Sequence, residues 1–170
     1  HVDALYNILE EKYSDDVTRY HSRVKPERRK KQLLFDFLQG ERKIMISTSA
    51  FSMGIDVSDI ELVVHFNAPI SMTDYIQQIG RAGRDGRKAH CVIFYDQNGD
   101  DDAISNSFIK KAKKQSPEAA KVIKAKLSQV HDFINSNNCM VSDILKYQGQ
   151  HETKTCKRCT VCAQKRRNSR

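Results

Sequence analysis

Two arginines near the middle of the chain have the type and spacing needed for phosphate chemistry. Arg81 and Arg84 lie in the glycine-rich segment 77–86, which is spelled QQIGRAGRDG. A guanidinium group stays charged when it is partly desolvated and forms paired hydrogen bonds with phosphate oxygens. One hypothesis is therefore an arginine finger that stabilises a transferring phosphoryl group. The alternative is a glycine-rich helix end that carries solvated arginines.

Four of the five cysteines have the spacing of a metal site. Cys156, Cys159 and Cys162 follow one another at intervals of three, and Cys139 lies upstream. Four thiolates suit tetrahedral Zn²⁺ in a closed structural site, which stabilises a fold and performs no reaction. The alternative is an iron–sulfur cluster, which uses similar spacings. The fifth cysteine, Cys91, stands in an apolar run and is predicted to be a small buried hydrophobic residue.

The segments that must position these residues alternate between short apolar runs and amphipathic stretches. Apolar residues at helical spacing predict helices over 2–13, between Pro26 and Gly40, and after Ser71, where Asp74 completes a capping box. Short runs rich in β-branched, aromatic or other apolar residues predict strands at 17–21, 43–47, 61–66 and 91–95. This alternation predicts an α/β domain with a doubly wound parallel sheet.

The composition changes after the last predicted strand. An acidic cluster at 96–102 is followed by a lysine-rich helical pattern over 103–137, in which Pro117 is predicted to separate two helices. We place the domain boundary here, with one domain over residues 1–100 and a second over 101–170. The basic residues 165–170 are predicted to be frayed.

Charge and hydrophobicity limit the possible partners. Lys and Arg total 29 against 21 Asp and Glu, a net charge of +8 that favours polyanions such as nucleic acid, although many basic domains carry such charge only as solvated surface. No apolar run approaches the roughly 20 residues that span a bilayer, and no secretion signal is present at the start. We expect an intracellular protein without a membrane partner.

The motifs resemble those of a known family in type, order and spacing. The segment from Gln77 to Arg84 resembles the last conserved motif of superfamily 2 helicases, and its continuation to Gly86 resembles the RecQ family. The loop at 50–56, AFSMGID, resembles the Ala-Phe-Gly-Met-Gly-Ile-Asp loop of that family, and Tyr20-His21 with Arg28 resembles the segment before it. The four cysteines also resemble the zinc-binding subdomain that follows the RecQ motor.

The resemblance implies both a fold and an activity. The fold would be a RecA-like parallel-sheet domain, the second domain of the helicase core and truncated at its N-terminus, followed by a small, mostly helical Cys₄ zinc-binding subdomain. The activity would be that of the C-terminal part of an ATP-dependent 3′–5′ DNA helicase that unwinds DNA in repair or recombination. Its partner would be single-stranded and partly duplex DNA, in a bacterial cytoplasm or nucleoid or in a eukaryotic nucleus.

The resemblance also implies roles for individual residues. Arg84 would be the arginine finger, Arg81 its neighbour in the same site, and Gln77 the residue that senses the nucleotide. Gly54 and Asp56 would link the nucleotide to the DNA; the alternative for Asp56 is a helix or turn cap. The remaining predicted DNA contacts are the hydroxyls of Thr48 and Ser49 and the imidazole of His21.

Several positions depart from the family, and one half of the catalytic machinery is missing. Ser52 and Arg23 stand where the family usually has glycine, and Met140 and Val141 stand where it tends to have arginines. No Gly-x-x-x-x-Gly-Lys-Ser/Thr segment occurs, so ATP and Mg²⁺ would be bound mainly by an N-terminal RecA-like domain of the same parent chain. The fragment alone is expected to be inactive. The alternative function is a stand-alone, zinc-stabilised module that binds nucleic acid without motor activity.

Overall fold

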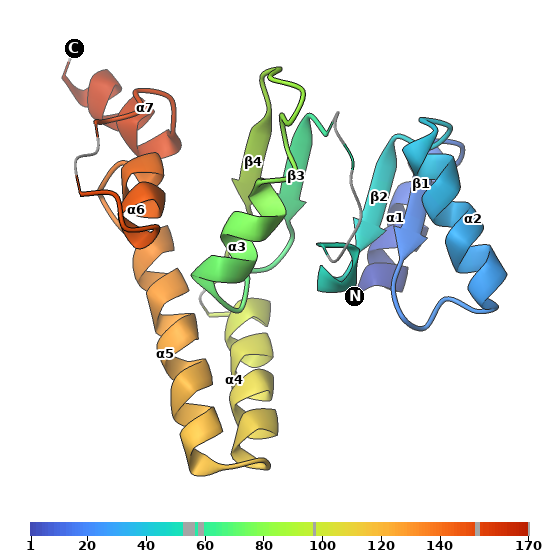
Figure 1. The fold of residues 1–170 in the computed structure, drawn as a ribbon, viewed down its shortest axis with the longest axis horizontal. Helices are drawn as coiled ribbons and strands as arrows, with labels where there is room; N and C mark the ends of the chain where they lie inside the picture. The colour runs from blue at the N-terminus through green and yellow to red at the C-terminus, as the bar shows by residue number, and fades with distance from the viewer. Residues whose placement is uncertain (53–56, 58–59, 97, 152–153, 170) are drawn as a thin grey trace. The chain divides into compact units, whose positions relative to one another are not determined.

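The computed structural model describes residues 1–52, 57, 60–96, 98–151 and 154–169, and it divides into two compact units (Figure 1). Unit 1 comprises His1–Ile60 and Gly83–Lys88, and unit 2 comprises Glu61–Ala82 and Ala89–Arg170. Two of the predicted ligand residues, Gly54 and Asp56, lie outside the described residues.

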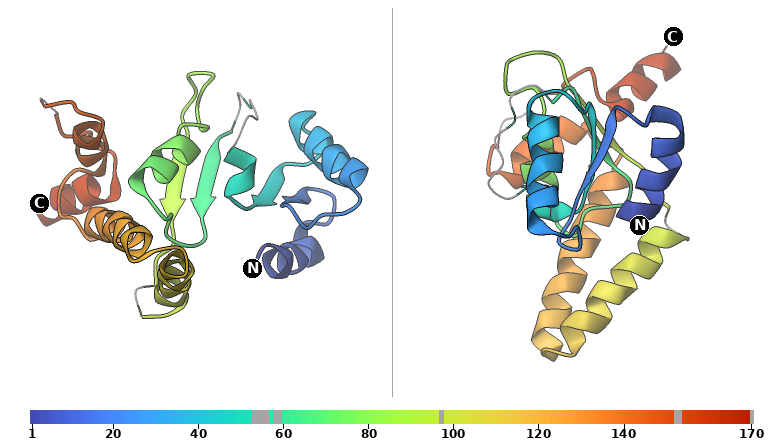
Figure 2. Two further views of the ribbon diagram at one scale, coloured as in Figure 1. Left: turned by 60° about the horizontal axis from the view of Figure 1, so that its bottom comes forward. Right: turned by 90° about the vertical axis from the view of Figure 1, so that its right-hand side faces the viewer.

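Unit 1 contains a two-stranded parallel sheet with a helix on each face, as the right-hand view of Figure 2 shows. Its elements are α1 (Val2–Tyr13), β1 (Val17–Tyr20), α2 (Glu27–Leu38), β2 (Ile44–Ser47) and the 3-10 helix η1 (Ser49–Ser52). Val17 lies beside Ile44 and Tyr20 beside Ser47. The parallel pairing places the carboxyl ends of β1 and β2 at the same edge of the sheet.

The local sequence explains the ends of these elements. α2 begins directly after Pro26, whose fixed φ suits the start of a helix, and Gly40 follows its end with a φ of 75°, which favours glycine. Val17 and Ile46 are buried between the helices. Phe51 lies against the rings of Tyr20 and Phe37, with centroids 6.1 and 5.8 Å away, and so holds η1 against the rest of the unit.

Unit 2 contains the second parallel pair of strands and most of the helices. Its elements are β3 (Leu62–His65), α3 (Met72–Ile79), β4 (His90–Ile93), α4 (Asp100–Lys113), α5 (Pro117–Ile134), α6 (Met140–Tyr147) and α7 (Thr160–Asn168). β3 and β4 pair with Val64 beside Val92. Ser116 caps α5 by accepting a hydrogen bond from the Ala119 N–H, and Pro117 occupies its first turn, so the predicted break between two helices is confirmed.

A hydrophobic core joins the sheet-side helix α3 to α5 and α6. Met72 and Tyr75 of α3 are buried with Val130 and Phe133 of α5, and residues of α6 pack around them. Each such side chain contributes about 1.5–3 kcal/mol when it is removed from water. This core therefore fixes α5 and α6 against α3.

Asp101 ties the first turn of α4 to two loops. Its carboxylate is buried and accepts hydrogen bonds from the backbone N–H of Ala68, at 2.6 Å, and of Asp96, at 2.8 Å. Ala68 lies beyond the end of β3 and Asp96 beyond the end of β4. One carboxylate thus joins the start of the helical region to the loops that leave both strands.

The sheet of unit 2 keeps an exposed apolar face. Leu62 and Val64 alternate along β3 and are 55% and 47% exposed, and Val92 beside Val64 is exposed as well. Cys91 is also exposed, so the prediction that it is buried was wrong. Ile93 lies two positions further along β4, on the same side of the strand as Cys91, and packs against the core. Cys91 itself lies beyond that contact.

The fold class expected from the sequence is confirmed: parallel α/β pairs precede a mostly helical segment that carries four clustered cysteines. Residues 165–170 were predicted to be frayed. For residues 165–168 this prediction was wrong, because α7 continues to Asn168. Its last turn contains Lys165, Arg166 and Arg167, and basic side chains there are favoured by the helix dipole. Among the described residues, no helix has the length and apolar character needed to cross a membrane.

Candidate functional site

The helix α3 carries Gln77 and ends at the glycine before Arg81. Ser71 caps its start, because the Ser71 hydroxyl oxygen accepts the Asp74 N–H at 3.0 Å, as the capping-box pattern predicts. Tyr75 anchors the helix in the core, and burial raises the pKa of its phenol to about 12. Gln77 is exposed and Arg81 is half-buried. The core therefore fixes the backbone from which these two side chains extend.

A tight turn carries Arg84. Gly83 and Gly86 have φ values of 67° and 81°, and the Gly86 N–H donates to the Gly83 carbonyl at 3.0 Å. The Gly83 N–H donates to the Ile60 carbonyl at 3.0 Å, which anchors the turn within unit 1. Arg84 is exposed on this turn. Gln77 and Arg81 belong to unit 2 and Arg84 to unit 1, so the three predicted catalytic residues divide between the units.

The predicted DNA contacts lie at the carboxyl edge of the β1–β2 sheet. Thr48 directly follows β2, and its N–H donates to the carbonyl of Tyr20 at 3.4 Å. His21 directly follows β1 and is buried, with Nε2 3.1 Å from Asp3 Oδ1. Thr48 and Ser49 are exposed. The structure therefore brings all three predicted residues to one edge of one sheet.

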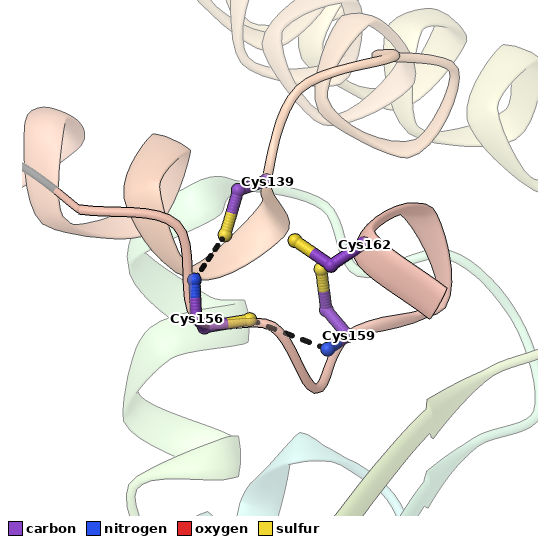
Figure 3. Close-up of side chains that lie close together, drawn as sticks. All are labelled: Cys139, Cys156, Cys159 and Cys162. Atoms are coloured by element: carbon purple, nitrogen blue, oxygen red, sulfur yellow. Dashed lines mark hydrogen bonds between the residues drawn. The ribbon is translucent and has the colours of Figure 1, made fainter. Parts of the chain in front are cut away.

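The four predicted metal ligands form a single cluster (Figure 3). The Sγ atoms of Cys139, Cys156, Cys159 and Cys162 all lie within 4.8 Å of one another. Zn–S bonds of about 2.3 Å in a tetrahedron require S···S separations of about 3.8 Å, so only small side-chain movements separate this cluster from zinc geometry. The donor set and the spacing thus fit a closed four-coordinate site.

Backbone N–H groups already point at the sulfurs. The Cys156 N–H donates to Cys139 Sγ at 3.2 Å, and the Cys159 N–H donates to Cys156 Sγ at 3.2 Å (Figure 3). Cys139 and Cys159 also occupy the N-cap positions of α6 and α7, where the helix dipole favours a thiolate. The loop therefore provides hydrogen bonds of the kind that stabilise thiolate ligands.

The pKa values of these thiols reflect that environment. Burial raises the pKa of Cys139, but the hydrogen bonds from the backbones of Cys156 and Ser142 outweigh it, and the pKa falls to about 6. At Cys162, burial and the neighbouring thiols raise the pKa to about 12. Hydrogen bonds from the Cys162 and Met140 backbones likewise outweigh burial and lower the pKa of Cys159. The cluster therefore contains thiols that ionise readily, at Cys139 and Cys159, beside Cys162, which holds its proton.

Sequence reasoning missed two polar contacts near these sites. Asp3 accepts from His21 and Arg19 although it lies at the start of α1, a separation along the chain that no spacing pattern detects. Buried His65 lies 2.7 Å from Gln78 Oε1, next to Gln77 on α3. The alternation of side chains along β3 can predict that His65 faces inward, but it cannot predict which side chain His65 contacts.

Two family comparisons match separate parts of the chain. Residues 1–86 match the helicase conserved C-terminal domain, and residues 100–163 match the RecQ zinc-binding family. This chain belongs to the RecQ helicase family. The first match contains Gln77, Arg81 and Arg84, and the second contains all four clustered cysteines.

Known RecQ helicases are similar over most of the chain. The ATP-dependent DNA helicase RecQ of Bacillus subtilis (strain 168) is 35% identical over 87% of this chain and 24% of the relative. The protein of the same name from Pasteurella multocida (strain Pm70) is 32% identical over 84% of this chain and 22% of the relative. This RecQ-family chain therefore spans about a quarter of the length of these curated relatives.

A solved structure shows the same kind of fold. Dbp5 of S. cerevisiae, bound to RNA and ADP BeF3, aligns with a TM-score of 0.50 over 74% of this chain and 35% of that chain, at 24% identity. At this identity the likeness is one of fold. It agrees with the RecA-like fold expected for residues 1–86, the part of the chain that matches the helicase conserved C-terminal domain.

Proposed function

We propose that the chain is the C-terminal part of an ATP-dependent 3′–5′ DNA helicase, with a second RecA-like domain over residues 1–100 and a zinc-binding subdomain over 101–170. The observation that carries the proposal is the match of residues 1–86 to the helicase conserved C-terminal domain, with the Gln77–Gly86 segment inside it. Repair or recombination of DNA inside the cell is the process in which such a motor would act.

Arg84 is the proposed arginine finger. Its exposed position on a turn that is fixed by two glycines lets it reach a phosphate held outside this chain. Arg81 would join it at the same phosphates, and Gln77 would contact the nucleotide from the exposed face of α3. Guanidinium groups suit this task because they neutralise charge that develops on the transferred phosphoryl group.

The nucleotide itself would be held by another domain of the same parent chain. An N-terminal RecA-like domain would bind ATP and Mg²⁺, and the cleft between the two domains would close over them. The present chain would then hydrolyse no ATP alone. Gly54 and Asp56, which follow η1 in the sequence and lie outside the described residues, are proposed to transmit the state of the nucleotide to the DNA contacts.

Thr48 and Ser49 are the proposed contacts with the DNA backbone, with His21 beside them. Hydroxyl and backbone N–H groups hold phosphates without reading the base sequence, which suits a motor that moves along any strand. Their shared position at the carboxyl edge of the sheet supports this role, since ligands of parallel α/β sheets bind at that edge.

Cys139, Cys156, Cys159 and Cys162 are the proposed ligands of one structural Zn²⁺. When bound, the ion would join the start of α6 to the start of α7 through four sulfurs and leave no open coordination position. The clustered thiols and the match to the RecQ zinc-binding family support zinc over an iron–sulfur cluster. A colourless purified protein with about one zinc per chain would agree with this choice.

The decisive experiment measures ATP turnover by the full-length parent with and without single-stranded DNA. We expect DNA to stimulate turnover and Arg84→Ala to lower it by about 10³-fold while DNA binding is retained. Arg87→Ala, on the same turn, is the matched control and is expected to keep turnover nearly unchanged. DNA-independent turnover, or full activity of Arg84→Ala, would instead favour a binding module without motor activity.

A further inference from the structure

A groove of about 580 Å³ lies along one side of the hairpin that α4 and α5 form in unit 2 (Figure 1). Its lining positions on α4 lie between Asp101 and Ile109 and recur at the spacing of one helix face. Those on α5 lie between Lys124 and His131 and follow the same spacing. The volume is in the range of roughly 300–1,000 Å³ that is typical of ligand sites.

The end of the groove nearest the sheet is held in place by contacts within unit 2. Tyr95, in the segment beyond β4, meets the ring of His131 on α5 edge-on, with centroids 6.2 Å apart. The buried carboxylate of Asp101 holds the backbone of Ala68 and Asp96 at the same end. These walls are therefore formed before any ligand arrives, which lowers the entropy that binding must offset.

The floor of the groove is apolar and its rim is polar. Val130 is buried and Ile109 and Leu127 are half-buried, so a large apolar side chain of a ligand would displace water from them. The amide of Asn106 and the hydroxyl of Ser128 are exposed at the rim. Amides and hydroxyls both donate and accept hydrogen bonds, as the backbone of an extended peptide requires.

The end of the groove nearest the hairpin turn is basic. Lys124 lines the groove and is exposed. Lys121, one turn earlier on α5, and Lys113, one turn beyond Ile109 on α4, continue the two lining faces and are exposed as well. Within the described ranges, no salt bridge joins these three lysines to an acidic residue. Their uncompensated charge favours a ligand with carboxylates at this end.

The length of the groove limits the size of the ligand. From Asp102 to Lys113 the axis of α4 rises about 16 Å, at 1.5 Å per residue. An extended chain advances about 3.3 Å per residue, so roughly five residues would fill the groove and reach the lysines. A short linear segment fits this surface better than a folded domain does.

Two features favour a peptide over a nucleic-acid strand. Asp102 stands at the rim with an exposed carboxylate, which accepts the Asn106 amide at 3.0 Å and would repel a phosphodiester. Tyr95 and His131 are the aromatic residues of the lining, and their rings already pack against each other. The groove therefore offers no free ring on which a base could stack.

We propose that this groove docks a short acidic segment of a partner protein, with one large apolar side chain on the floor and carboxylates beside the three lysines. The segment would be extended, and its backbone would form hydrogen bonds with Asn106 and Ser128. The surface uses none of the residues assigned to ATP, DNA or zinc. It therefore goes beyond the proposed motor function and does not depend on it.

The test begins with an unbiased selection. Displayed random heptapeptides are selected on the zinc-loaded 170-residue chain at about 0.15 M salt, where exposed long-range charge effects are screened. We expect the recovered sequences to be enriched in Asp and Glu next to one Leu, Ile, Met or Phe. The most enriched peptide is then labelled, and its binding is measured by fluorescence anisotropy.

One pair of variants tests the charge. Lys121→Gln/Lys124→Gln removes two cations from the basic end, and Lys111→Gln/Lys126→Gln removes two exposed lysines of the same helices that do not line the groove. An exposed ion pair contributes a factor of about 1.4–5 in affinity. The groove variant should therefore bind the peptide about 5-fold more weakly, and its control less than about 2-fold more weakly.

A second pair blocks the groove without changing its charge. Ser128→Tyr places a ring over the floor, and Gln129→Tyr places the same ring at an exposed neighbouring position outside the groove. Exclusion of one apolar side chain from the floor should weaken binding by at least about 10-fold, whereas the control should bind normally. Circular dichroism and zinc content confirm equal folding of all the proteins.

The proposal would be overturned by a selection that yields no enrichment in acidic and apolar residues. Equal binding of the peptide by each groove variant and its control would also overturn it. An oligothymidylate serves as the competing ligand: if it binds through Lys121 and Lys124 while no selected peptide does, the surface belongs to nucleic acid and the peptide assignment is wrong. Failure of the motor function is separate, because it appears in the turnover of the Arg84→Ala parent.

Discussion

The buried carboxylate of Asp101 offers a sharp test of how the two strand ends are connected to the helical region. Asp101→Asn keeps the shape of the side chain but places an NH₂ group against one of the two backbone N–H donors, at Ala68 or Asp96. One charge-assisted hydrogen bond, worth about 1.5–3 kcal/mol, is lost, and a buried N–H is left without an acceptor. We expect the free energy of unfolding to fall by about 2–3 kcal/mol.

Asp102→Asn is the matched control on the same turn of α4. Asp102 is exposed, and its carboxylate accepts a hydrogen bond from the Asn106 side-chain amide at 3.0 Å, so its replacement is expected to cost less than about 0.5 kcal/mol. Urea unfolding followed by circular dichroism at constant zinc content measures both variants. A loss for Asp101→Asn no larger than that for Asp102→Asn would refute the assigned role of the buried carboxylate.

Two further predictions concern the metal cluster and pH. Cys156→Ser, or a zinc chelator added to the unmodified chain, should release about one zinc per chain and lower the thermal midpoint, as metal analysis and melting would show; an unchanged midpoint would contradict a structural role. At His65, burial lowers the pKa, so the unfolded chain binds a proton at higher pH than the folded chain does. The contribution of His65 to the free energy of unfolding is therefore fully present above about pH 6.5. It is lost as the pH falls from there through the lowered pKa of His65 in the folded chain. His65→Gln should flatten this part of the pH profile measured by urea unfolding, whereas exposed His151→Gln should leave it unchanged.

The features that the sequence predicted correctly depend on local chemistry. Pro26, Ser71 and Pro117 mark helix starts through their own backbone or side-chain geometry, and all three helices begin where expected. The cysteine spacing predicted the cluster because four thiols at such intervals suit few arrangements other than a metal site.

The features that it missed depend on contacts between distant segments. The Asp3 carboxylate reaches His21 and Arg19 only because α1 packs beside β1. The role of Asp101 requires two loops to converge on one helix turn, and within an acidic cluster nothing distinguishes it from its exposed neighbours. Cys91 was predicted buried from its apolar neighbours, but burial depends on which helix covers that end of the strand.

The uncovered apolar face of the β3–β4 sheet has a practical consequence for every binding measurement on this chain. Each strand of the pair keeps one edge without a strand partner among the described residues, and Leu62, Val64 and Val92 stand exposed beside those edges. Such a surface favours self-association, which the net charge of +8 opposes through repulsion. Added salt screens that repulsion while it also weakens phosphate contacts. A salt titration therefore moves two equilibria at once, and sedimentation at each salt concentration separates a released strand from a protein that has begun to assemble with itself.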